Sequence, residues 1–322
     1  MNIGLDIGYA ATKIVAALDR RASFPSVVGT PDKARFSLDS TSAILLEEPR
    51  RVLVGADAVL QSRHITRRED RRWIESNEWY TLALAAMTEI TTGTRAEMNI
   101  VTGLPISFYD DRDAVQARLA GQHRVQREDR PAQQFNVNDV RVIPQPFGAL
   151  LSVALDNSGK IIDHNLATGQ VGVIDIGGKT TNLLAVSSLS EINRETASVG
   201  VGAWSVVRAL RAWMAREYPD LDLRDHQVAE VVQLRRLTYY GEEIEIGDII
   251  DDILEPMASQ IIAEATQLWN GAAGLKAILV AGGGALLLGE YVRRHFRHAR
   301  VVDDPVFANA TGFWKFARRI AG

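Results

Sequence analysis

One stretch of the chain combines residues that could grip phosphate and a metal ion. Residues 171–186, VGVIDIGGKTTNLLAV, place a polar turn between two apolar runs, which predicts a strand, a tight turn and a second strand. The turn supplies glycines, a lysine and a hydroxyl group, at Gly177, Gly178, Lys179 and Thr180. Glycines let the backbone approach an anion closely and turn N–H groups toward it. Asp175 precedes the turn, and because a carboxylate would repel phosphate, it implies an intervening Mg²⁺ held through water.

This stretch is not the P-loop of nucleoside triphosphatases. A P-loop has four residues between its first glycine and the glycine that precedes Lys-Thr, and the position of the first glycine is occupied here by Val173. No long helical pattern follows the turn. An ordinary glycine hairpin without a ligand remains an alternative when the stretch is taken alone.

Residues 2–18 repeat the pattern near the amino terminus. An apolar run ends in Asp6 and Gly8, and a return strand begins at Lys13. The two copies, about 170 residues apart, indicate two related domains that clasp one polyphosphate between them. Lys13 would supply a point charge to the phosphates, and Asp6 and Asp175 would face each other across the metal.

Three further turns favour the same chemistry, and the first of them has a plain structural alternative. Gln145 stands between two prolines at a strand-to-helix corner, where it either orients a water for attack on phosphate or is a simple turn residue. Residues 200–202, GVG, open a helix whose N-terminus could receive an anion. Residues 282–284, GGG, join a buried strand to a helix and permit close approach of a flat or anionic ligand.

The composition excludes several classes of protein. The 322 residues suffice for two domains, and 46% hydrophobic with 24% charged residues is typical of a soluble globular protein. The net charge of −4 argues against broad nucleic-acid binding, and no apolar run reaches the length of a membrane span. The absence of cysteine excludes disulfides and thiolate chemistry and fits a cytoplasmic location.

Two segments leave alternatives open. Residues 63–72, RHITRREDRR, are a solvated or subunit-contacting surface, or a nucleic-acid site that would lack the aromatic residues expected for stacking. The last helix places Phe313, Phe316, Ala317 and Ile320 on one face, which either docks on the core or lies on a membrane surface. We expect core docking.

The order of these motifs resembles that of the actin superfamily. The segments LDIGYAATK, VIPQPFGAL, VIDIGGKTTN, LVAGGGALLL and NATGFWKF are similar to its phosphate-1, connect-1, phosphate-2, adenosine and connect-2 motifs. The short length, the DIGG turn and the stretches TGLPISFYDDR and SVGVGAWSV are most similar to the ParM/StbA group of bacterial and archaeal actin-like ATPases. The resemblance covers the whole chain. It implies an α/β actin/chaperone-type ATPase fold, with two duplicated RNase H-like domains flanking a nucleotide cleft.

We expect the domains to follow this pattern. Domain I would span residues 1–157, with a smaller subdomain at about 30–95, and be completed by a carboxy-terminal helix at about 303–322. Domain II would span 158–302, with a smaller subdomain at about 205–255. A polar, glycine-containing stretch after residue 157 marks the boundary.

The resemblance implies a role for each motif residue. Asp6 and Asp175 hold Mg²⁺ through water, and Gln145 positions the attacking water. The residues that line the phosphates of ATP or ADP are Gly8, Tyr9, Lys13, Gly177, Gly178, Lys179 and Thr180. Near the ribose and phosphates are Gly200 and Gly202, and beside the adenosine are Gly282, Gly283, Gly284 and Ala285.

Two positions depart from the family pattern. Tyr9 stands where many members have Ser or Thr, so that a backbone N–H would replace a hydroxyl contact to the γ-phosphate. Asn182 stands where relatives often have Asp, so that a carboxylate is missing.

The implied function is an ATPase that polymerises into filaments with ATP and hydrolyses it slowly, for plasmid segregation or as a prokaryotic cytoskeletal element. Its partners would be further copies of the chain and a DNA-bound adaptor, with no direct contact to nucleic acid or membrane. Three alternatives stay open: a membrane-tethered division or pilus ATPase, a small-molecule kinase on the same fold, and a chaperone-type protein. The kinase would need an acid poised as a base, and the chaperone a substrate domain after the ATPase core.

Overall fold

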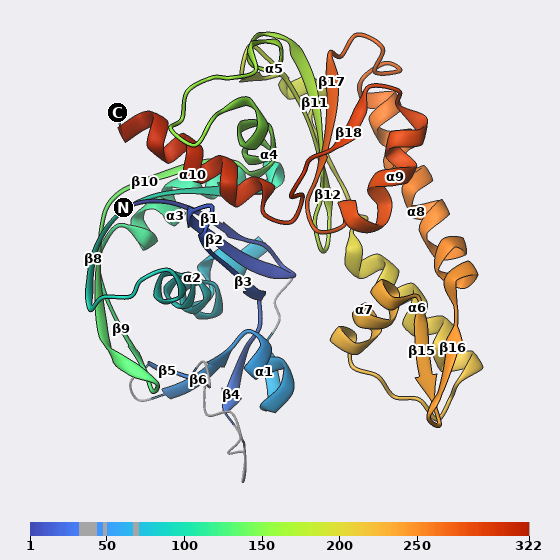
Figure 1. Cartoon of the computed structure of the whole chain (residues 1–322), viewed down its shortest axis with the longest axis horizontal. Coiled ribbons are helices and arrows are strands. Elements are labelled where there is room, and N and C mark those ends of the chain that lie inside the picture. Colours follow the sequence, from blue (N-terminus) through green and yellow to red (C-terminus); the bar gives the residue numbers. More distant parts are fainter. Residues whose placement is uncertain (32–43, 48–49, 67–70, 322) are drawn as a thin grey trace. The chain divides into compact units, whose positions relative to one another are not determined.

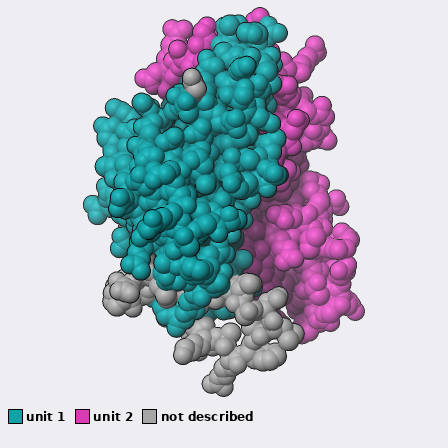
Figure 2. Space-filling view, turned by 60° about the vertical axis from the view of Figure 1, so that its left-hand side comes forward, with its two compact units in different colours: residues 1–169, 307–322 teal, residues 170–306 magenta. Residues whose placement is uncertain are grey.

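The computed structural model describes residues 1–31, 44–47, 50–66 and 71–321 (Figure 1). They form two compact units: unit 1 contains residues 1–169 and 307–322, and unit 2 contains residues 170–306 (Figure 2). The chain therefore returns to unit 1 after completing unit 2. The domain and subdomain limits given above stay predictions, and part of the arginine-rich stretch 63–72 lies outside the described residues.

Unit 1 is built on a mixed sheet, which has ten strands within the described residues, in the order β3-β2-β1-β8-β10-β9-β5-β6-β4-β7. The strands are β1 (Asn2–Ile7), β2 (Ala11–Ala17), β3 (Arg20–Pro25), β4 (Val28–Pro31), β5 (Ile44–Glu47), β6 (Arg50–Val54), β7 (Ser62–Thr66), β8 (Arg95–Leu104), β9 (Gly121–Arg127) and β10 (Arg130–Pro144). The α-helices are α1 (Ala56–Gln61), α2 (Asn77–Glu89), α3 (Arg112–Leu119), α4 (Gln145–Ala154), α5 (His164–Thr168) and α10 (Ala308–Ala321).

Unit 2 contains a smaller mixed sheet in the order β13-β12-β11-β17-β18, with β14 also paired to β12, and a separate hairpin of β15 and β16. The strands are β11 (Gln170–Ile176), β12 (Thr181–Ser187), β13 (Ser190–Glu191), β14 (Ala197–Val199), β15 (Arg236–Tyr239), β16 (Glu242–Glu245), β17 (Ala277–Ala281) and β18 (Ala299–Val301). The α-helices are α6 (Ala203–Glu217), α7 (Asp225–Leu234), α8 (Gly247–Leu268) and α9 (Ala285–His295).

The two large sheets share one topology. In unit 1, β2 runs antiparallel to β1, which is followed by the parallel strands β8 and β10. In unit 2, β12 runs antiparallel to β11, which is followed by the parallel strands β17 and β18. The duplication predicted from the two hairpin sequences is therefore present in the strand order, although little sequence outside the hairpins reveals it.

Strand β1 illustrates how unit 1 is layered. Successive side chains of a strand point to opposite faces of its sheet. Ile3 and Leu5 are fully buried in the cluster that contains Leu82 of α2. Gly4 lies against α10 instead, because a Cβ at this position would come within 1.9 Å of the Ala310 carbonyl oxygen. The central sheet is thus covered by α2 on one face and by α10 on the other.

The last helix docks on the core, as expected. Phe313 and Ala317 of α10 are buried against Val101 of β8, whereas Ile320 is 46% exposed. In Figure 1, α10 lies beside α4, and the two helices are in contact. None of the helices in the described part of the chain combines the length and hydropathy that a bilayer span requires.

Two helix starts are fixed by local features. Ser76 is the N-cap of α2, because its side chain accepts a hydrogen bond from Trp79 N at 3.1 Å. Helix α4 begins at Gln145 itself, with Pro146 in its first turn, where the missing N–H of a proline costs no helical hydrogen bond. Gln145 is therefore positioned at the strand-to-helix corner by the first turn of a helix.

A buried lysine ties α10 to the carboxy-terminal end of α4. Lys315 Nζ donates to the carbonyl oxygens of Ser152 at 2.5 Å and Leu155 at 2.7 Å. Burial lowers the pKa of Lys315, while Asp156 opposes that shift. A cation at the end of a helix satisfies carbonyl groups that lack helical partners.

Replacing this lysine should destabilise unit 1. We expect Lys315→Met, which keeps the apolar stem, to lower the free energy of unfolding by about 1–3 kcal/mol, because two buried carbonyls lose their donors. Urea denaturation measures the change. Lys160→Met, at an exposed lysine of the same unit, is the matched control, and equal stabilities of the two variants would contradict the assigned role.

Candidate functional site

The first hairpin joins β1 to β2 and buries an acid at its end. Asp6 is only 2% exposed and lies opposite Lys13 in the β1–β2 register. Lys13 Nζ lies 3.3 Å from Asp6 Oδ2. Gly8 N donates to Ala11 O at 3.1 Å and closes the turn. A buried carboxylate and a lysine are thereby held next to a glycine turn.

Gln145 joins this group from the start of α4. Its Nε2 donates to Asp6 Oδ1 at 2.7 Å. Because the amide nitrogen is used in this bond, the orientation of the side chain is fixed, and the amide oxygen is left as an acceptor. The structure therefore brings Gln145, Asp6 and Lys13 together, although they are far apart in the sequence.

Tyr9 lies in the same turn, but its ring packs toward the core of unit 1. The ring is half-buried and its centroid is 6.1 Å from that of Trp73. A contact from the backbone N–H of Tyr9 to a phosphate stays a prediction.

The second hairpin joins β11 to β12 with the same geometry. Asp175 is 3% exposed and lies opposite Asn182, as Asp6 lies opposite Lys13. Gly177 N donates to Thr180 O at 2.9 Å, which reproduces the turn closure of the first hairpin. Asn182 corresponds to Lys13 by position but not by chemistry. Its Oδ1 accepts from Ser198 Oγ at 2.6 Å, so that it fastens β14 to the sheet.

Helix α6 holds the second turn through its first amides. Ala203 N donates to Gly177 O at 3.0 Å, and Trp204 N donates to Gly178 O at 2.8 Å. The N–H of a trans peptide points opposite to its C=O. The N–H groups of Gly178 and Lys179, which belong to the same two peptides, therefore point away from α6. The sequence indicated that the start of this helix could receive an anion, and in the structure its first two amides donate to carbonyl groups of the turn.

Gly202 permits this close contact. A Cβ at Gly202 would lie 2.5 Å from Gly178 O and 2.7 Å from Gly177 O, too near for any side chain. A Cβ at Gly200, in contrast, would meet nothing within 4 Å. The two glycines of this turn thus differ, since one is required by the packing and the other borders open space.

The turn after β17 lies over the end of β11. Gly282 has φ +84°, and a Cβ there would lie 2.6 Å from Asp175 Oδ1. Gly284 N donates to Ile176 O at 2.9 Å, while a Cβ at Gly283 would meet nothing within 4 Å. The 177–180 turn, the start of α6 and the 282–284 turn are therefore gathered around Asp175.

The donor set fits a Mg²⁺ ion bound mainly through water and phosphate. Mg²⁺ prefers oxygen ligands and keeps several of its waters, so that one or two carboxylates suffice for it. Each unit offers one buried carboxylate at a hairpin end, Asp6 or Asp175. Among the described residues, no group of three or more His, Cys, Asp or Glu side chains could chelate a metal directly. The juxtaposition of Asp6 with Asp175 stays a prediction.

Sequence reasoning missed the hydroxyl groups that fix both hairpins. Thr12 Oγ1 lies 2.9 Å from Ser26 Oγ, and Thr181 Oγ1 donates to Val201 O at 2.8 Å. Both threonines are fully buried and stand six positions after the hairpin acid. That shared spacing was a usable signal, because a hydroxyl buried in an apolar strand needs a partner.

The comparisons identify both halves of the chain. Residues 4–148 match the family model described as "Actin like proteins N terminal domain". Residues 173–294 match the family model described as "Archaeal actin homologue MreB-like, C-terminal". A curated protein from Thermoplasma acidophilum, described as an archaeal actin homolog, is 25% identical to the chain over 98% of both sequences.

Solved structures agree on the fold. Crystal structures of an archaeal actin homolog superpose with a TM-score of 0.85, or 0.83 for its complex with ADP, at 23% identity and with 99% of each chain covered. A 15-stranded ParM filament from Clostridium botulinum gives a TM-score of 0.78 at 21% identity, again over 99% of each chain. The chain is an actin-like protein, built from an actin-like amino-terminal domain and an MreB-like carboxy-terminal domain.

Proposed function

We propose that this protein binds ATP with Mg²⁺, hydrolyses it, and assembles into filaments in a nucleotide-dependent manner. The observation that carries the proposal is the repeated hairpin, which places a buried acid at the end of a glycine turn in each of two similarly built units. A similarly folded archaeal actin homolog has been crystallised with ADP, and a similarly folded ParM forms filaments.

In this proposal the phosphates are bound by the two turns and the adenosine by the turn after β17. The phosphate ligands are Gly8, Tyr9, Lys13, Gly177, Gly178, Lys179 and Thr180, with Gly200 and Gly202 toward the ribose. The adenosine lies beside Gly282, Gly283, Gly284 and Ala285. Asp6 and Asp175 would hold Mg²⁺ through water, and the ion would supply neutralisation of phosphate charge.

The chemical step requires only positioning and charge. A water attacks the γ-phosphate in line, with its orientation set by Gln145, while Lys13 neutralises developing negative charge. The bond from Gln145 to Asp6 holds the amide group in place before substrate arrives. No covalent nucleophile is needed.

Nucleotide would control assembly by favouring one of two states. ATP would favour a form of the protein whose surfaces can bind the next copy in a filament, and ADP would weaken those contacts. Hydrolysis would then limit the lifetime of the polymer. Contacts between different surfaces of successive copies give open filaments and not closed rings. We place the protein in the cytoplasm, with plasmid segregation through a DNA-bound adaptor, or a cytoskeletal role, as its task.

Three measurements test the proposal. Phosphate release from ATP should depend on Mg²⁺, and sedimentation with ATP, with ADP and without nucleotide should give a pellet that ATP increases. Electron microscopy of the pellet should reveal filaments. Absence of hydrolysis together with absence of a pellet would refute the function.

Gln145→Ala should slow hydrolysis and spare assembly. Because the side chain acts on the attacking water and not on nucleotide binding, we expect the rate of phosphate release to fall about 100-fold, within the range of lost acid–base or positioning groups. The pellet with ATP should persist or increase. Gln260→Ala, at an exposed glutamine of α8, is the control. An unchanged rate of phosphate release in Gln145→Ala would mean that Gln145 only begins a helix and takes no part in hydrolysis.

A further inference from the structure

A row of three polar side chains crosses the sheet of unit 1 far from the hairpin turns in sequence. Gln134 of β10 pairs in register with Arg95 of β8 on one side and with Arg124 of β9 on the other. Residues opposite each other on neighbouring strands share a face of the sheet. The row therefore places one guanidinium group on each side of the Gln134 amide. We call these residues the arginine row.

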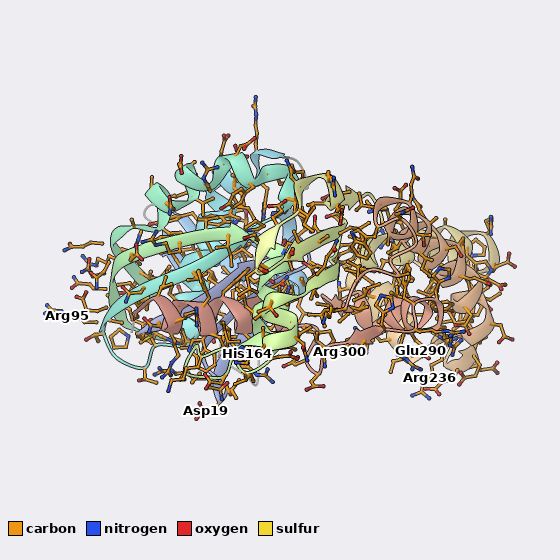
Figure 3. All side chains as sticks on the ribbon, turned by 90° about the horizontal axis from the view of Figure 1, so that it is seen from above. Asp19, Arg95, His164, Arg236, Glu290 and Arg300 are labelled. Carbon is orange, nitrogen blue, oxygen red and sulfur yellow. The ribbon has the colours of Figure 1, made fainter. Side chains whose placement is uncertain are left out.

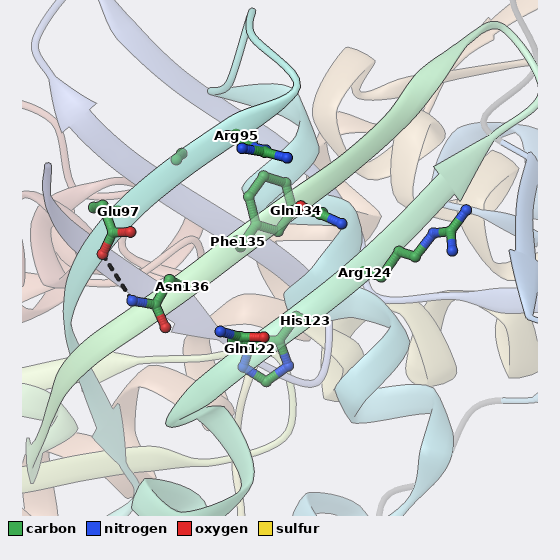
Figure 4. A pocket seen from close by; sticks show the side chains of 9 residues that line it. Arg95, Glu97, Gln122, His123, Arg124, Gln134, Phe135 and Asn136 are labelled. Atoms are coloured by element: carbon green, nitrogen blue, oxygen red, sulfur yellow. Dashed lines mark hydrogen bonds between the residues drawn. The ribbon is translucent and has the colours of Figure 1, made fainter.

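The arginine row borders a cavity of about 630 Å³ on this face of the sheet (Figure 4). Arg95 points away from the ribbon of unit 1 into open space (Figure 3), and Arg95, Arg124 and Gln134 are all exposed. Within the residues that the structure describes, neither guanidinium makes an ion pair or a hydrogen bond. The two guanidinium groups lie on either side of Gln134 and repel each other weakly at this separation, so an anion placed between them would be attracted by both.

The nearest acid on this face does not supply that anion. Glu97 lies in the next row and accepts hydrogen bonds from Asn136 Nδ2 at 2.8 Å and Asn138 Nδ2 at 2.9 Å. These amide donors lower the pKa of Glu97, so that its carboxylate stays ionised, and they already occupy it with hydrogen bonds. The charge of the arginine row is left for a ligand from outside unit 1.

The chemistry of the row selects carboxylate groups on a protein surface. Two strand spacings separate Arg95 from Arg124, about 10 Å between Cα atoms, so that both planar forks can reach one pair of acids. Gln122, Gln134 and Asn136 add only amides to this open face. It lacks the largely apolar lining of small-molecule sites. A protein surface that presents several carboxylates fits this face best.

The chain itself carries such a surface on α8. Asp248, Asp252 and Glu255 are exposed and lie on one side of the helix, opposite the buried Ile250 and Leu254. We call the three acids the acidic face. Like charges three or four residues apart on a helix destabilise it. Within the described residues none of the three has an ion-pair partner, so that a basic partner would relieve their repulsion.

We propose that the arginine row of one copy binds the acidic face of a second copy of this chain. The overall charges agree, because unit 2 has 13 basic and 19 acidic residues, a net charge of −6, whereas unit 1 has 23 and 21, a net charge of +2. A contact between two different surfaces can be repeated from copy to copy without closing. The proposal rests on the self-assembly proposed above and adds the surfaces that carry it.

Charge reversal on each side tests the pairing. The row variant carries Arg95→Glu and Arg124→Glu, and the face variant carries Asp252→Arg and Glu255→Arg. Each variant alone would oppose like charges, so we expect the concentration needed for ATP-dependent sedimentation to rise at least about tenfold. An equimolar mixture should assemble again, because each kind of copy then meets opposite charges on both surfaces.

The controls separate this contact from general charge effects and from misfolding. Arg216→Glu with Arg297→Glu, at exposed arginines elsewhere, changes the net charge equally and should leave sedimentation unchanged. All substituted positions are exposed, so that thermal unfolding should be unaffected. The milder pair Arg95→Gln and Arg124→Gln should weaken assembly with the same sign.

Cross-linking tests proximity directly, because the natural chain has no cysteine. Copies with Gln134→Cys mixed with copies carrying Asp252→Cys should form a disulfide-linked pair under mild oxidation. Copies with Gln134→Cys mixed with copies carrying Glu217→Cys should not.

The outcomes distinguish the two levels of the argument. Normal assembly of the row variant, or failure of the mixture to recover, overturns the proposed pairing and leaves the nucleotide-dependent polymer standing. Absence of any ATP-dependent pellet in the unsubstituted protein overturns the filament function, and this contact with it. Recovery in the mixture together with the specific disulfide supports both.

Discussion

Asp175→Asn should reduce ATP hydrolysis by a factor of about 100 or more, the scale expected when a charge-stabilising group is lost from a reacting centre. The substitution keeps the shape of the side chain and removes its negative charge. Asp175 is buried at the end of β11, beside the 282–284 turn. Without the carboxylate, the proposed Mg²⁺ loses one of its two protein anchors, and the phosphates lose orientation.

Phosphate release over a range of Mg²⁺ concentrations measures this effect. We expect the Mg²⁺ dependence to shift to higher concentration as the rate falls, which a general loss of stability would not produce. Asp303→Asn, at an exposed acid of unit 2, is the matched control. Turnover at the normal rate in Asp175→Asn would refute the assignment of this residue to the metal.

Gly312→Ala should destabilise the protein strongly, by about 3 kcal/mol or more, the upper range for an overpacked interior. A Cβ at Gly312 of α10 would lie 1.8 Å from the carbonyl oxygen of Gly148 in α4, and backbone atoms cannot move aside as a flexible side chain can. Helix propensity alone predicts the opposite sign, because alanine favours a helix over glycine by about 1 kcal/mol. The sign of the change therefore decides between the two effects.

Equilibrium unfolding in urea, followed by circular dichroism, gives this free energy. Gly274→Ala is the control, since a Cβ at Gly274 would meet nothing within 4 Å. We expect that variant to change stability by less than about 0.5 kcal/mol. A gain of stability in Gly312→Ala would mean that α10 and α4 do not pack as closely as the structure has them.

The hairpins were predictable because their signals are local. Each hairpin carries an Asp-x-Gly pattern, Asp6 with Gly8 or Asp175 with Gly177, which predicts a strand end and a tight turn within a few residues. The similarity of the two copies supported the prediction more strongly than either copy alone. The actin-like fold was implied by the resemblance of five segments, in order, to the motifs of the actin superfamily. Gln145 was predictable only as a residue at a corner, and its bond to Asp6 required the fold.

Other features depend on contacts that no local pattern contains. The start of α6 was a candidate for anion binding, because the N-terminus of a helix can receive an anion. The sequence does not reveal that Gly177 and Gly178 supply the carbonyl oxygens instead. The arginine row was equally hidden, since Arg95, Gln134 and Arg124 become neighbours only through strand register.

The grip of α6 on the second turn has a mechanical consequence. Two adjoining peptide planes, 177–178 and 178–179, are fastened to the first residues of a 15-residue helix, which is about 22 Å long. Arg211, in the middle of that helix, forms an ion pair with Asp225 at the start of α7. If a nucleotide binds this turn as proposed, we expect the loss of its terminal phosphate to tilt these planes and to shift the far end of α6 relative to α7.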